Sequence, residues 1–370
     1  MKKKKILFAS SVHRFNDVRI YHKEIFSLYN HYNIDLIATK SNFKANDNLN
    51  ISIKLLPNPS NFFLRIYNNI QILLVGLRRQ YDGFHFHDPE LIIVAFILKI
   101  FKKKIIFDIH EDNLNVIKMR KWIPSFLKPV IIKLFSRLEK FAVKSFDGII
   151  LAEDSYKKKF FQSKKIITVR NYVKLLTNPI QTNFKNKNIL YVGSITIERG
   201  ILDLIKSLGL LQKKNKKIGL FLIGTISKID KSIINNQINL LPYPENVEII
   251  KYCNYDELKK YVQKSKIGVS PLKDNENYQY SIPTKILDYM NWGLPYVFSE
   301  LNLSKKLFKK KSGGISYELN DTYDLFKKLS KLLNDDQLCY KLSVDGRKKI
   351  KDFEWKTESK KLTNLYKKIF

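Results

Sequence analysis

Histidines and carboxylates gather in two short stretches of the first half of the chain. The run FHFHDP places His85 and His87 on the same side of an expected strand, and FDIHED adds Asp108 and His110. Neutral imidazoles with a carboxylate are ordinary metal ligands, so a His-x-His site with a third histidine is one interpretation. A histidine beside a carboxylate can instead orient a substrate or transfer a proton, because its pKa lies near neutrality. A histidine that is simply hydrogen-bonded at a strand end is the third interpretation.

A second candidate site lies in the stretch SIPTKILDYMNWGLPYVFSE, from Ser281 to Glu300. Pro283 suits the first turn of a helix, where the free N–H groups of the backbone can bind a phosphate. Lys285 and Asp288 stand three residues apart and share one helix face, and the carboxylate could accept hydrogen bonds from a ribose diol. A surface ion pair on an ordinary helix is the alternative interpretation.

A glycine turn and a basic residue form the third candidate. The run ILYVGS places Gly193 at a turn from strand to loop, and Arg199 with Gly200 opens the next helix, where a guanidinium could meet a phosphate. An arginine that merely faces solvent is the alternative. Neither G-x-G-x-x-G after the first strand nor G-x-x-x-x-G-K-[ST] occurs, which disfavours nicotinamide and P-loop sites. No D-x-D triplet occurs either, so a carboxylate-held divalent metal is not indicated.

Short strand-like runs alternate with helical patterns and must position these residues. ILFAS, IDLIAT, ISIKLLP, GFHFHD, KIIFDIH, GIILAE and IITVRN precede a polar stretch at residues 178–188, which we interpret as a linker. After it follow ILYVGS, IGLFLIG, VEIIKY, IGVSPL, PYVFS and GISYEL. This alternation predicts an α/β fold with two parallel sheets, each covered by helices on both faces. Because ligands gather at the carboxyl ends of such strands, His13, His87 and His110 are expected to share one rim.

Composition bounds the class of protein. With 370 residues and 44% hydrophobic content, the chain can fill two cores, and its two cysteines cannot form a disulfide framework. The N-terminus turns polar too soon for a secretory signal, and LIIVAFILKIF is about half of the ~20 residues that a membrane span needs, so we expect a cytoplasmic protein. The net charge of +33 fits a nucleic-acid or membrane partner, or a general compositional bias. Between Lys118 and Lys144, basic and apolar residues interleave as in a helix that lies on an anionic membrane.

Taken together, these stretches resemble the GT-B glycosyltransferases of family GT4, the glycosyl transferase group 1 type, especially the bacterial enzymes that build surface polysaccharides. The similarity covers nearly the whole chain and rests on NDVRIYHKEIFSL, YDGFHFHDPEL, IIFDIHED, ILYVGSITIERGILDLIKSL, PTKILDYMNWGLPYVFS and FEWKTESKKLTNLYKKI. It implies two Rossmann-like domains facing across a cleft, with residues 1–180 on the acceptor side and 181–350 holding a nucleotide-sugar donor. Residues 351–370 would form a last helix that crosses back onto the first domain.

The resemblance also implies roles for residues. His87 would lie by the transferred sugar, Arg199 would neutralise the leaving diphosphate, and Asp288 would bind the ribose. The expected donor site comprises Gly193, Ser194, Arg199, Pro283, Thr284, Lys285 and Asp288. The expected acceptor side comprises Asp17, Arg19, His110 and Glu111. Tyr280 stands where the family often has a first glutamate, and Ser194 where it often has a second basic ligand, for which Lys285 is expected to compensate.

The expected function is retaining transfer of a sugar from an NDP-sugar to a saccharide or lipid-linked saccharide, in surface polysaccharide synthesis. The nucleotide-sugar is a substrate, and neither a metal nor a cofactor is expected. Contact with an anionic membrane is the further expected partnership. A nucleotide-sugar epimerase on the same fold is one alternative, and a basic nucleic-acid-binding protein is another, which would bind with steep salt dependence. The absence of aromatic–basic repeats argues against the latter.

Overall fold

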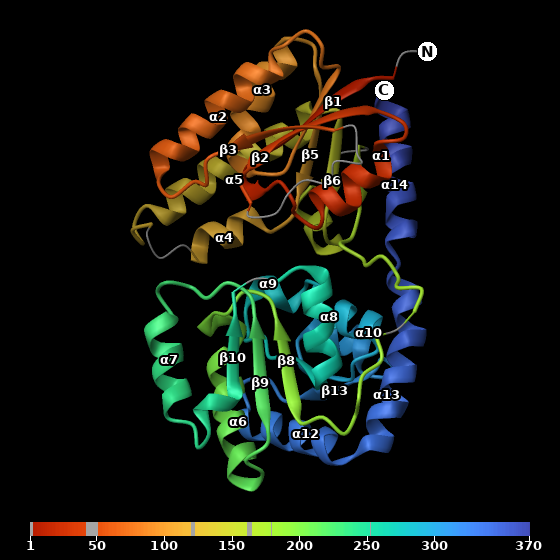
Figure 1. The fold of residues 1–370 in the computed structure, drawn as a ribbon. Helices are drawn as coiled ribbons and strands as arrows, with labels where there is room; N and C mark the ends of the chain where they lie inside the picture. Colours follow the sequence, from red (N-terminus) through yellow and green to blue (C-terminus); the bar gives the residue numbers. More distant parts are fainter. Residues whose placement is uncertain (1–2, 42–50, 120–122, 161–164, 179, 252) are drawn as a thin grey trace. The chain divides into compact units, whose positions relative to one another are not determined.

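The computed structural model of this protein describes residues 3–41, 51–119, 123–160, 165–178, 180–251 and 253–370. The chain divides into two compact units, Met1–Asn171 with Trp355–Phe370, and Tyr172–Glu354 (Figure 1). These boundaries differ from the expected ones at residues 180 and 350. The difference arises because Val173 and Phe353 lie in the core of the second unit, where the Val173 N–H donates a hydrogen bond to the Phe353 carbonyl at 3.1 Å.

The described part of the first unit contains one sheet of parallel strands in the order β3-β2-β1-β4-β5-β6-β7. Its strands are β1 (Lys5–Arg14), β2 (Asn33–Thr39), β3 (Ser52–Leu56), β4 (Gly83–Phe86), β5 (Lys104–Ile109), β6 (Gly148–Leu151) and β7 (Ile166–Thr168). Its helices are η1 (Ile20–Ile25), α1 (Phe26–Leu28), α2 (Phe62–Gly76), η2 (Pro89–Leu91), α3 (Ile92–Ile100), α4 (Asn113–Met119), α5 (Lys128–Ser145), η3 (Asp154–Lys159) and α14 (Trp355–Ile369).

Two hydrophobic cores sandwich this sheet. On one face, α2, α3 and α5 bury residues such as Ile72, Leu98 and Val143. On the other face, η1, α1 and α14 do the same, and α14 contributes Leu362 and Tyr366. The last helix of the chain is therefore an integral layer of the first unit.

The second unit has the same architecture, with parallel strands in the order β10-β9-β8-β11-β12-β13 in its described part. Its strands are β8 (Asn188–Val192), β9 (Gly219–Ile223), β10 (Val247–Ile250), β11 (Ser265–Ser270), β12 (Tyr296–Ser299) and β13 (Gly314–Tyr317). Its helices are η4 (Ile197–Arg199), α6 (Ile201–Lys214), α7 (Lys231–Asn239), η5 (Pro244–Asn246), α8 (Tyr255–Lys264), α9 (Glu276–Gln279), α10 (Thr284–Trp292), α11 (Asn302–Phe308), α12 (Thr322–Asn334), α13 (Asp336–Lys349) and η6 (Ile350–Phe353). Helices α6 and α12 supply the core of one face, and α10 with η6 that of the other.

Polar side chains define several helix starts. Asn61 accepts a hydrogen bond from the Leu64 N–H at the start of α2, and Asn254 with Glu257 forms a reciprocal capping box at the start of α8. Within the residues described, no helix combines the length and the apolar composition that crossing a bilayer requires.

Gly200 is the residue on which the start of α6 depends. It has φ of +77° in the left-handed region, and a Cβ placed on it would lie 1.7 Å from the Pro271 carbonyl oxygen. A left-handed conformation costs a non-glycine residue roughly 1–2 kcal/mol, before any collision with the backbone. Gly200 thus fixes the turn that presents Arg199.

We expect Gly200→Ala to lower the free energy of unfolding by at least ~2 kcal/mol, because strain and collision add. Urea unfolding of the full chain measures this. Gly209→Ala, inside α6 and facing the Leu241 side chain with Pro242 beyond it, is the matched control and should not lower stability. Equal losses in both variants would show that the turn at Gly200 has no special role.

Candidate functional site

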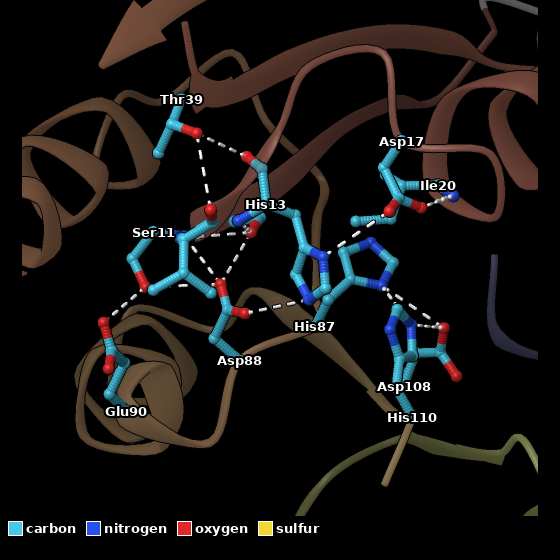
Figure 2. Close-up of polar contacts among 12 residues, drawn as sticks. Ser11, His13, Asp17, Ile20, Thr39, His87, Asp88, Glu90, Asp108 and His110 are labelled. Carbon is cyan, nitrogen blue, oxygen red and sulfur yellow. Dashed lines mark hydrogen bonds and ion pairs between the residues drawn. The ribbon is translucent and has the colours of Figure 1, made fainter. Parts of the chain in front are cut away.

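The carboxylate of Asp108, near the end of β5, organises the polar cluster of the first unit. His87 follows β4 and His110 follows β5, and the two strands are neighbours. The His110 Nε2 lies 2.6 Å and the His87 Nδ1 3.2 Å from the Asp108 Oδ2 (Figure 2). The two imidazoles contact each other, with 3.2 Å between His87 Nδ1 and His110 Nε2. Parallel pairing therefore brings together residues that lie far apart in the sequence.

Arg19 is the counter-ion of Asp108. Its Nε donates to Oδ2 at 2.9 Å and its Nη2 to Oδ1 at 2.8 Å, while its Nη1 donates to the Val169 carbonyl at 2.8 Å. The side chain lies 3.1 Å from the Glu24 carboxylate, and the residue is only 4% exposed. This arginine was assigned to the acceptor side; the structure places it beneath the rim, where it holds Asp108 in place.

The three acidic and basic groups around Arg19 divide into charged and neutral species. Although burial opposes ionisation, the Arg19 guanidinium and His110 hold the pKa of Asp108 well below its usual range. Burial and the charge of Asp108 raise the pKa of Glu24 well above its usual range, so of these two carboxyl groups Glu24 is the protonated one. Burial lowers the pKa of His87 to about 4, so its imidazole is neutral at pH 7. With its Nδ1–H directed at Asp108, the His87 Nε2 is left as a buried acceptor with no protein hydrogen-bond partner within the described ranges.

A second carboxylate, Asp88, completes the rim. Its Oδ2 accepts hydrogen bonds from the Ser10 hydroxyl at 2.7 Å and the Ser11 N–H at 2.6 Å, and its Oδ1 lies 3.5 Å from the His13 Nε2 (Figure 2). The His13 Nδ1 lies 3.5 Å from Asp17, whose Oδ1 also accepts the N–H groups of Arg19 and Ile20 at the start of η1. The His13 ring packs against His110 at 5.4 Å between centroids. The predicted rim of three imidazoles is thus present.

Opposite charges outweigh burial at His13. Burial lowers its pKa, but the hydrogen bond to Asp17 and the charges of Asp88 and Glu111 raise it to about 9. His13 is therefore an imidazolium at neutral pH. Glu111 itself is exposed and contributes to the rim through its charge.

Four buried side chains of this cluster form a group whose composition suits a metal ion. Glu24, His85, His87 and Asp108 each offer a ligand atom, and these atoms lie within 4.8 Å of one another. However, Arg19 already forms a two-point contact with Asp108 and approaches Glu24, so a guanidinium supplies the positive charge that a metal would bring. His85 has a partner of its own, because its Nδ1 lies 2.6 Å from the Tyr366 hydroxyl on α14. The donor set is therefore better explained by internal charge balance than by a metal.

In the second unit, Gly193, Arg199 and Lys285 converge. Gly193 follows β8 with φ of +133°, and a Cβ placed on it would lie 3.7 Å from both Arg199 Nη1 and Lys285 Nζ. Lys285 is 6% exposed, which excludes the surface ion pair considered for α10. Its Nζ lies 4.2 Å from the centre of the Tyr191 ring and has no hydrogen-bond partner within the described residues. Burial and the charge of Arg199 lower the pKa of Lys285 well below its usual range, against an opposing effect of Asp288.

Helix α10 is held at this site by a tyrosine. The Tyr289 hydroxyl donates to the Val269 carbonyl at 3.0 Å and accepts the Val192 N–H at 3.3 Å, and Gly268 leaves room beneath the ring. Pro283 is the N-cap of α10, so the helix begins at Thr284, one residue after the start that the sequence predicted. No side chain of the described residues caps this end, and the Ile286 N–H donates to the Pro283 carbonyl at 3.0 Å. The N–H groups of Thr284 and Lys285 precede it at the helix start, where an anion can bind. The first helical residue, Thr284, is exposed, and so is Tyr280.

Comparisons with known proteins find a family match within the second unit. Residues 176–349 match the family described as glycosyl transferases group 1. The uncharacterized glycosyltransferase MJ1178 of Methanocaldococcus jannaschii is 22% identical over 235 residues, which are 56% of this chain and 62% of that protein. The chain therefore spans less than two thirds of this relative.

Two solved structures are similar over nearly their whole length. Sucrose-phosphate synthase from Thermosynechococcus elongatus matches with a TM-score of 0.76 and 14% identity, covering 100% of this chain and 99% of that one. HepE from Anabaena, in complex with UDP-glucose, matches with a TM-score of 0.73 and 11% identity, covering 98% and 99%.

The match to glycosyl transferases group 1 lies within the second unit. Together with the two parallel sheets, the similarity to these structures confirms the predicted GT-B fold. The match of residues 176–349 agrees with the predicted resemblance to the group 1 type.

The residues predicted for the donor site are only partly together. Within the group 1 domain, Gly193, Arg199 and Lys285 meet, and Asp288 lies near enough for its charge to act on Lys285. Ser194 is exposed, and its carbonyl accepts a hydrogen bond from the Tyr191 hydroxyl at 2.7 Å.

Several residues of the first-unit cluster lay outside the predicted site. They are Ser10, Ser11, Glu24, Asp88 and Tyr366. Asp88 stands within the H-x-H-D run, so its sequence neighbours could have indicated it. Nothing local indicates Tyr366, which lies 281 residues from its partner.

The charged state of His13 predicts how stability depends on pH. The folded pKa of about 9 exceeds the unfolded value of 6.5, so this contribution is complete below pH 6.5 and is lost as the pH rises through 9. We expect the free energy of unfolding to fall more between pH 7 and 9.5 in the wild type than in His13→Gln. Urea titrations at several pH values measure the difference, with the exposed His31→Gln as control. Parallel pH profiles for wild type and His13→Gln would disprove the charge assignment.

Proposed function

We propose that this protein is a retaining glycosyltransferase that moves a sugar from an NDP-sugar to a saccharide or lipid-linked saccharide. Synthesis of a surface polysaccharide, such as a capsule, O-antigen or exopolysaccharide, is the proposed setting. The observation that carries the donor assignment is the pair Arg199 and Lys285 beside Gly193 in the group 1 domain. Retention, the acceptor class and the setting are supported by the family resemblance.

The burial of Lys285 without a hydrogen-bond partner needs a physical reason. A buried cation costs several kcal/mol unless it is paired, and Arg199 beside it makes the cost higher. An anion bound at this place would supply a hydrogen-bond partner for Lys285 and an opposite charge for both groups. A diphosphate fits the chemistry, because it carries charge enough for two cations and for the N–H groups at the start of α10.

The same groups account for catalysis. As the anomeric bond breaks, negative charge develops on the diphosphate, and fixed donors aimed at it lower the barrier. Arg199, Lys285 and the backbone at Pro283 and Thr284 would supply these donors without a metal. The departing phosphate could then accept the proton of the acceptor hydroxyl held beside it, so no carboxylate nucleophile is needed.

The remaining residues receive roles by the same proposal. Asp288 binds the ribose, and His87 contacts the transferred sugar with its neutral imidazole or its backbone. Asp17, His110 and Glu111 form the acceptor side, while Arg19 acts through Asp108. HepE is described in complex with UDP and with UDP-glucose, so UDP-sugars are the first donors to test. We place the reaction in the cytoplasm, at the inner face of the cytoplasmic membrane.

The variant Lys285→Met separates the effect of this lysine on stability from its effect on nucleotide binding. Met has a similar shape and no charge, so the variant should unfold with a free energy higher by about 1–3 kcal/mol in the absence of nucleotide. The same variant should bind the nucleotide at least ~10-fold more weakly, because a charge-assisted contact of about 1.5–3 kcal/mol is lost.

The measurements are urea unfolding and calorimetric titration with UDP-, GDP-, dTDP- and CMP-sugars. Slow donor hydrolysis is followed by mass spectrometry, which also detects an epimerised sugar and so tests the alternative activity. Lys206→Met, at an exposed position of α6, is the matched control and should alter neither quantity. A stabilised Lys285→Met with undiminished nucleotide affinity would refute the donor site.

Two further variants separate binding from turnover. His87→Ala should retain nucleotide affinity and lose turnover, because His87 acts at the transferred sugar. Asp288→Ala should weaken nucleotide affinity roughly 10-fold, since it removes hydrogen bonds of a carboxylate to the ribose. Donor hydrolysis and calorimetry report the two effects. Turnover at the wild-type rate in His87→Ala would eliminate the role assigned to this histidine.

A further inference from the structure

One face of the first unit presents apolar side chains to solvent from three adjacent helices. On α2 the exposed face carries Phe62, Phe63, Ile66, Tyr67, Ile70 and Leu74, and Phe63 is 79% exposed. Four of these recur at intervals of four residues, so they form a continuous stripe along the helix. The opposite face of α2, with Ile72 and Val75, already fills the core. The stripe is therefore additional to what folding requires.

Helix α3 extends this apolar surface. Ile93, Ile100 and Phe101 are exposed, with Ile100 at 78%. Helix α3 packs against both neighbours, since Gly76 of α2 lies close to the Leu98 side chain and Phe96 stacks on Phe141 of α5 at 5.2 Å. The three helices thus form one layer over the sheet.

Helix α5 adds basic residues to the same layer. Its exposed face alternates apolar residues with cations, in the order Val130, Lys133, Leu134, Arg137, Lys140, Phe141 and Lys144. In α2 and α3 there is no acidic residue, and the only one in α5 is Glu139, which is buried and accepts a hydrogen bond from Asn113 at 2.7 Å. The exposed side of these helices therefore combines apolar groups with positive charge and no negative charge. We call it the three-helix surface.

We propose that the three-helix surface docks on a membrane containing anionic lipids. Aromatic and aliphatic side chains of α2 and α3 would enter the boundary between headgroups and acyl chains, and the cations of α5 would meet the lipid phosphates. A second copy of the chain is the other occupant of such a face, but a two-fold contact would set the cations of α5 against each other. Charge complementarity therefore favours the lipid surface.

This proposal extends the contact that the stretch Lys118–Lys144 predicted. Within that stretch, Arg120, Lys121 and Trp122 lie outside the described residues. The structure assigns the larger apolar share to α2 and α3, which the sequence pattern did not single out. Membrane docking deepens the proposed lipid-linked acceptor, but its test needs neither donor nor acceptor, so the two proposals can fail separately.

Co-sedimentation with vesicles tests the proposal on the full chain. Vesicles of phosphatidylcholine alone and with one third phosphatidylglycerol are compared at low and high salt. We expect binding to the anionic vesicles only, and a loss of it as salt rises. Equal binding to neutral vesicles, or none to either, would overturn the proposal.

Two variants locate the contact. Lys133→Glu/Lys140→Glu should lower the partition constant at least ~10-fold, because each cation near an anionic surface contributes roughly fivefold. Phe63→Ser/Ile70→Ser should lower it by a similar factor of about 10, because apolar insertion is lost. Both sets of side chains are exposed, so the fold should be kept, as circular dichroism verifies.

Controls in the second unit match each change. Ile229→Ser/Leu240→Ser removes two side chains that are each 77% exposed, and Lys259→Glu/Lys260→Glu reverses two exposed cations of α8. Neither should alter vesicle binding. Losses as large as those of the three-helix variants would show a non-specific effect of charge or hydrophobicity. Self-association that Phe63→Ser/Ile70→Ser abolishes, without vesicle binding by the wild type, would identify a second copy as the occupant.

Discussion

The ion pair between Arg19 and Asp108 is the interaction on which the first unit depends. Its two parallel hydrogen bonds hold the carboxylate charged in a place that water does not reach. His87 and His110 are oriented by that charge. Glu24 is protonated, because burial and the nearby Asp108 charge raise its pKa. Removing one partner of such a pair costs about 3–5 kcal/mol, because the other is left buried and uncompensated. The rim above it is therefore only as rigid as this contact.

The site of the second unit follows the opposite logic. There Arg199 and Lys285 are brought together, no group among the described residues forms a hydrogen bond to the Lys285 Nζ, and burial together with the charge of Arg199 lowers the pKa of the lysine. Holding two basic groups close together lowers the stability of the fold, which is common at sites that bind an anionic ligand. The first unit balances its charges internally, whereas the second leaves two adjacent basic groups to which the proposed substrate would bring the opposite charge. The proposed donor site can therefore be argued from charge, whereas the proposed acceptor side cannot.

Periodicity and motif spacing predicted much of the fold, because strand patterns that alternate with helical patterns indicate parallel strands. The rim of His13, His87 and His110 follows from the rule that parallel strands end at one edge. The sequence did not predict the environment of individual side chains. Arg19 is of a residue type that often binds ligands, and only tertiary packing shows that it is buried. The units divide after residues 171 and 354, near the expected 180 and 350, and the hydrogen bond from the Val173 N–H to the Phe353 carbonyl joins segments that no local pattern connects. Pairings over such separations are set by topology and leave no trace in neighbouring residues.

The three-helix surface is a second feature that the sequence alone did not predict. A helix with apolar residues on every side reads from sequence as a buried helix, and α2 and α3 would be interpreted so. Only the packing of α3 between α2 and α5 shows which faces of these helices remain outside the core. For α5 the mixed basic and apolar pattern was visible in the sequence, since charge marks the exposed side. The cations of one helix thus identify the environment of the apolar residues on the other two: a partner that accepts both hydrocarbon and positive charge has the chemistry of an anionic lipid surface.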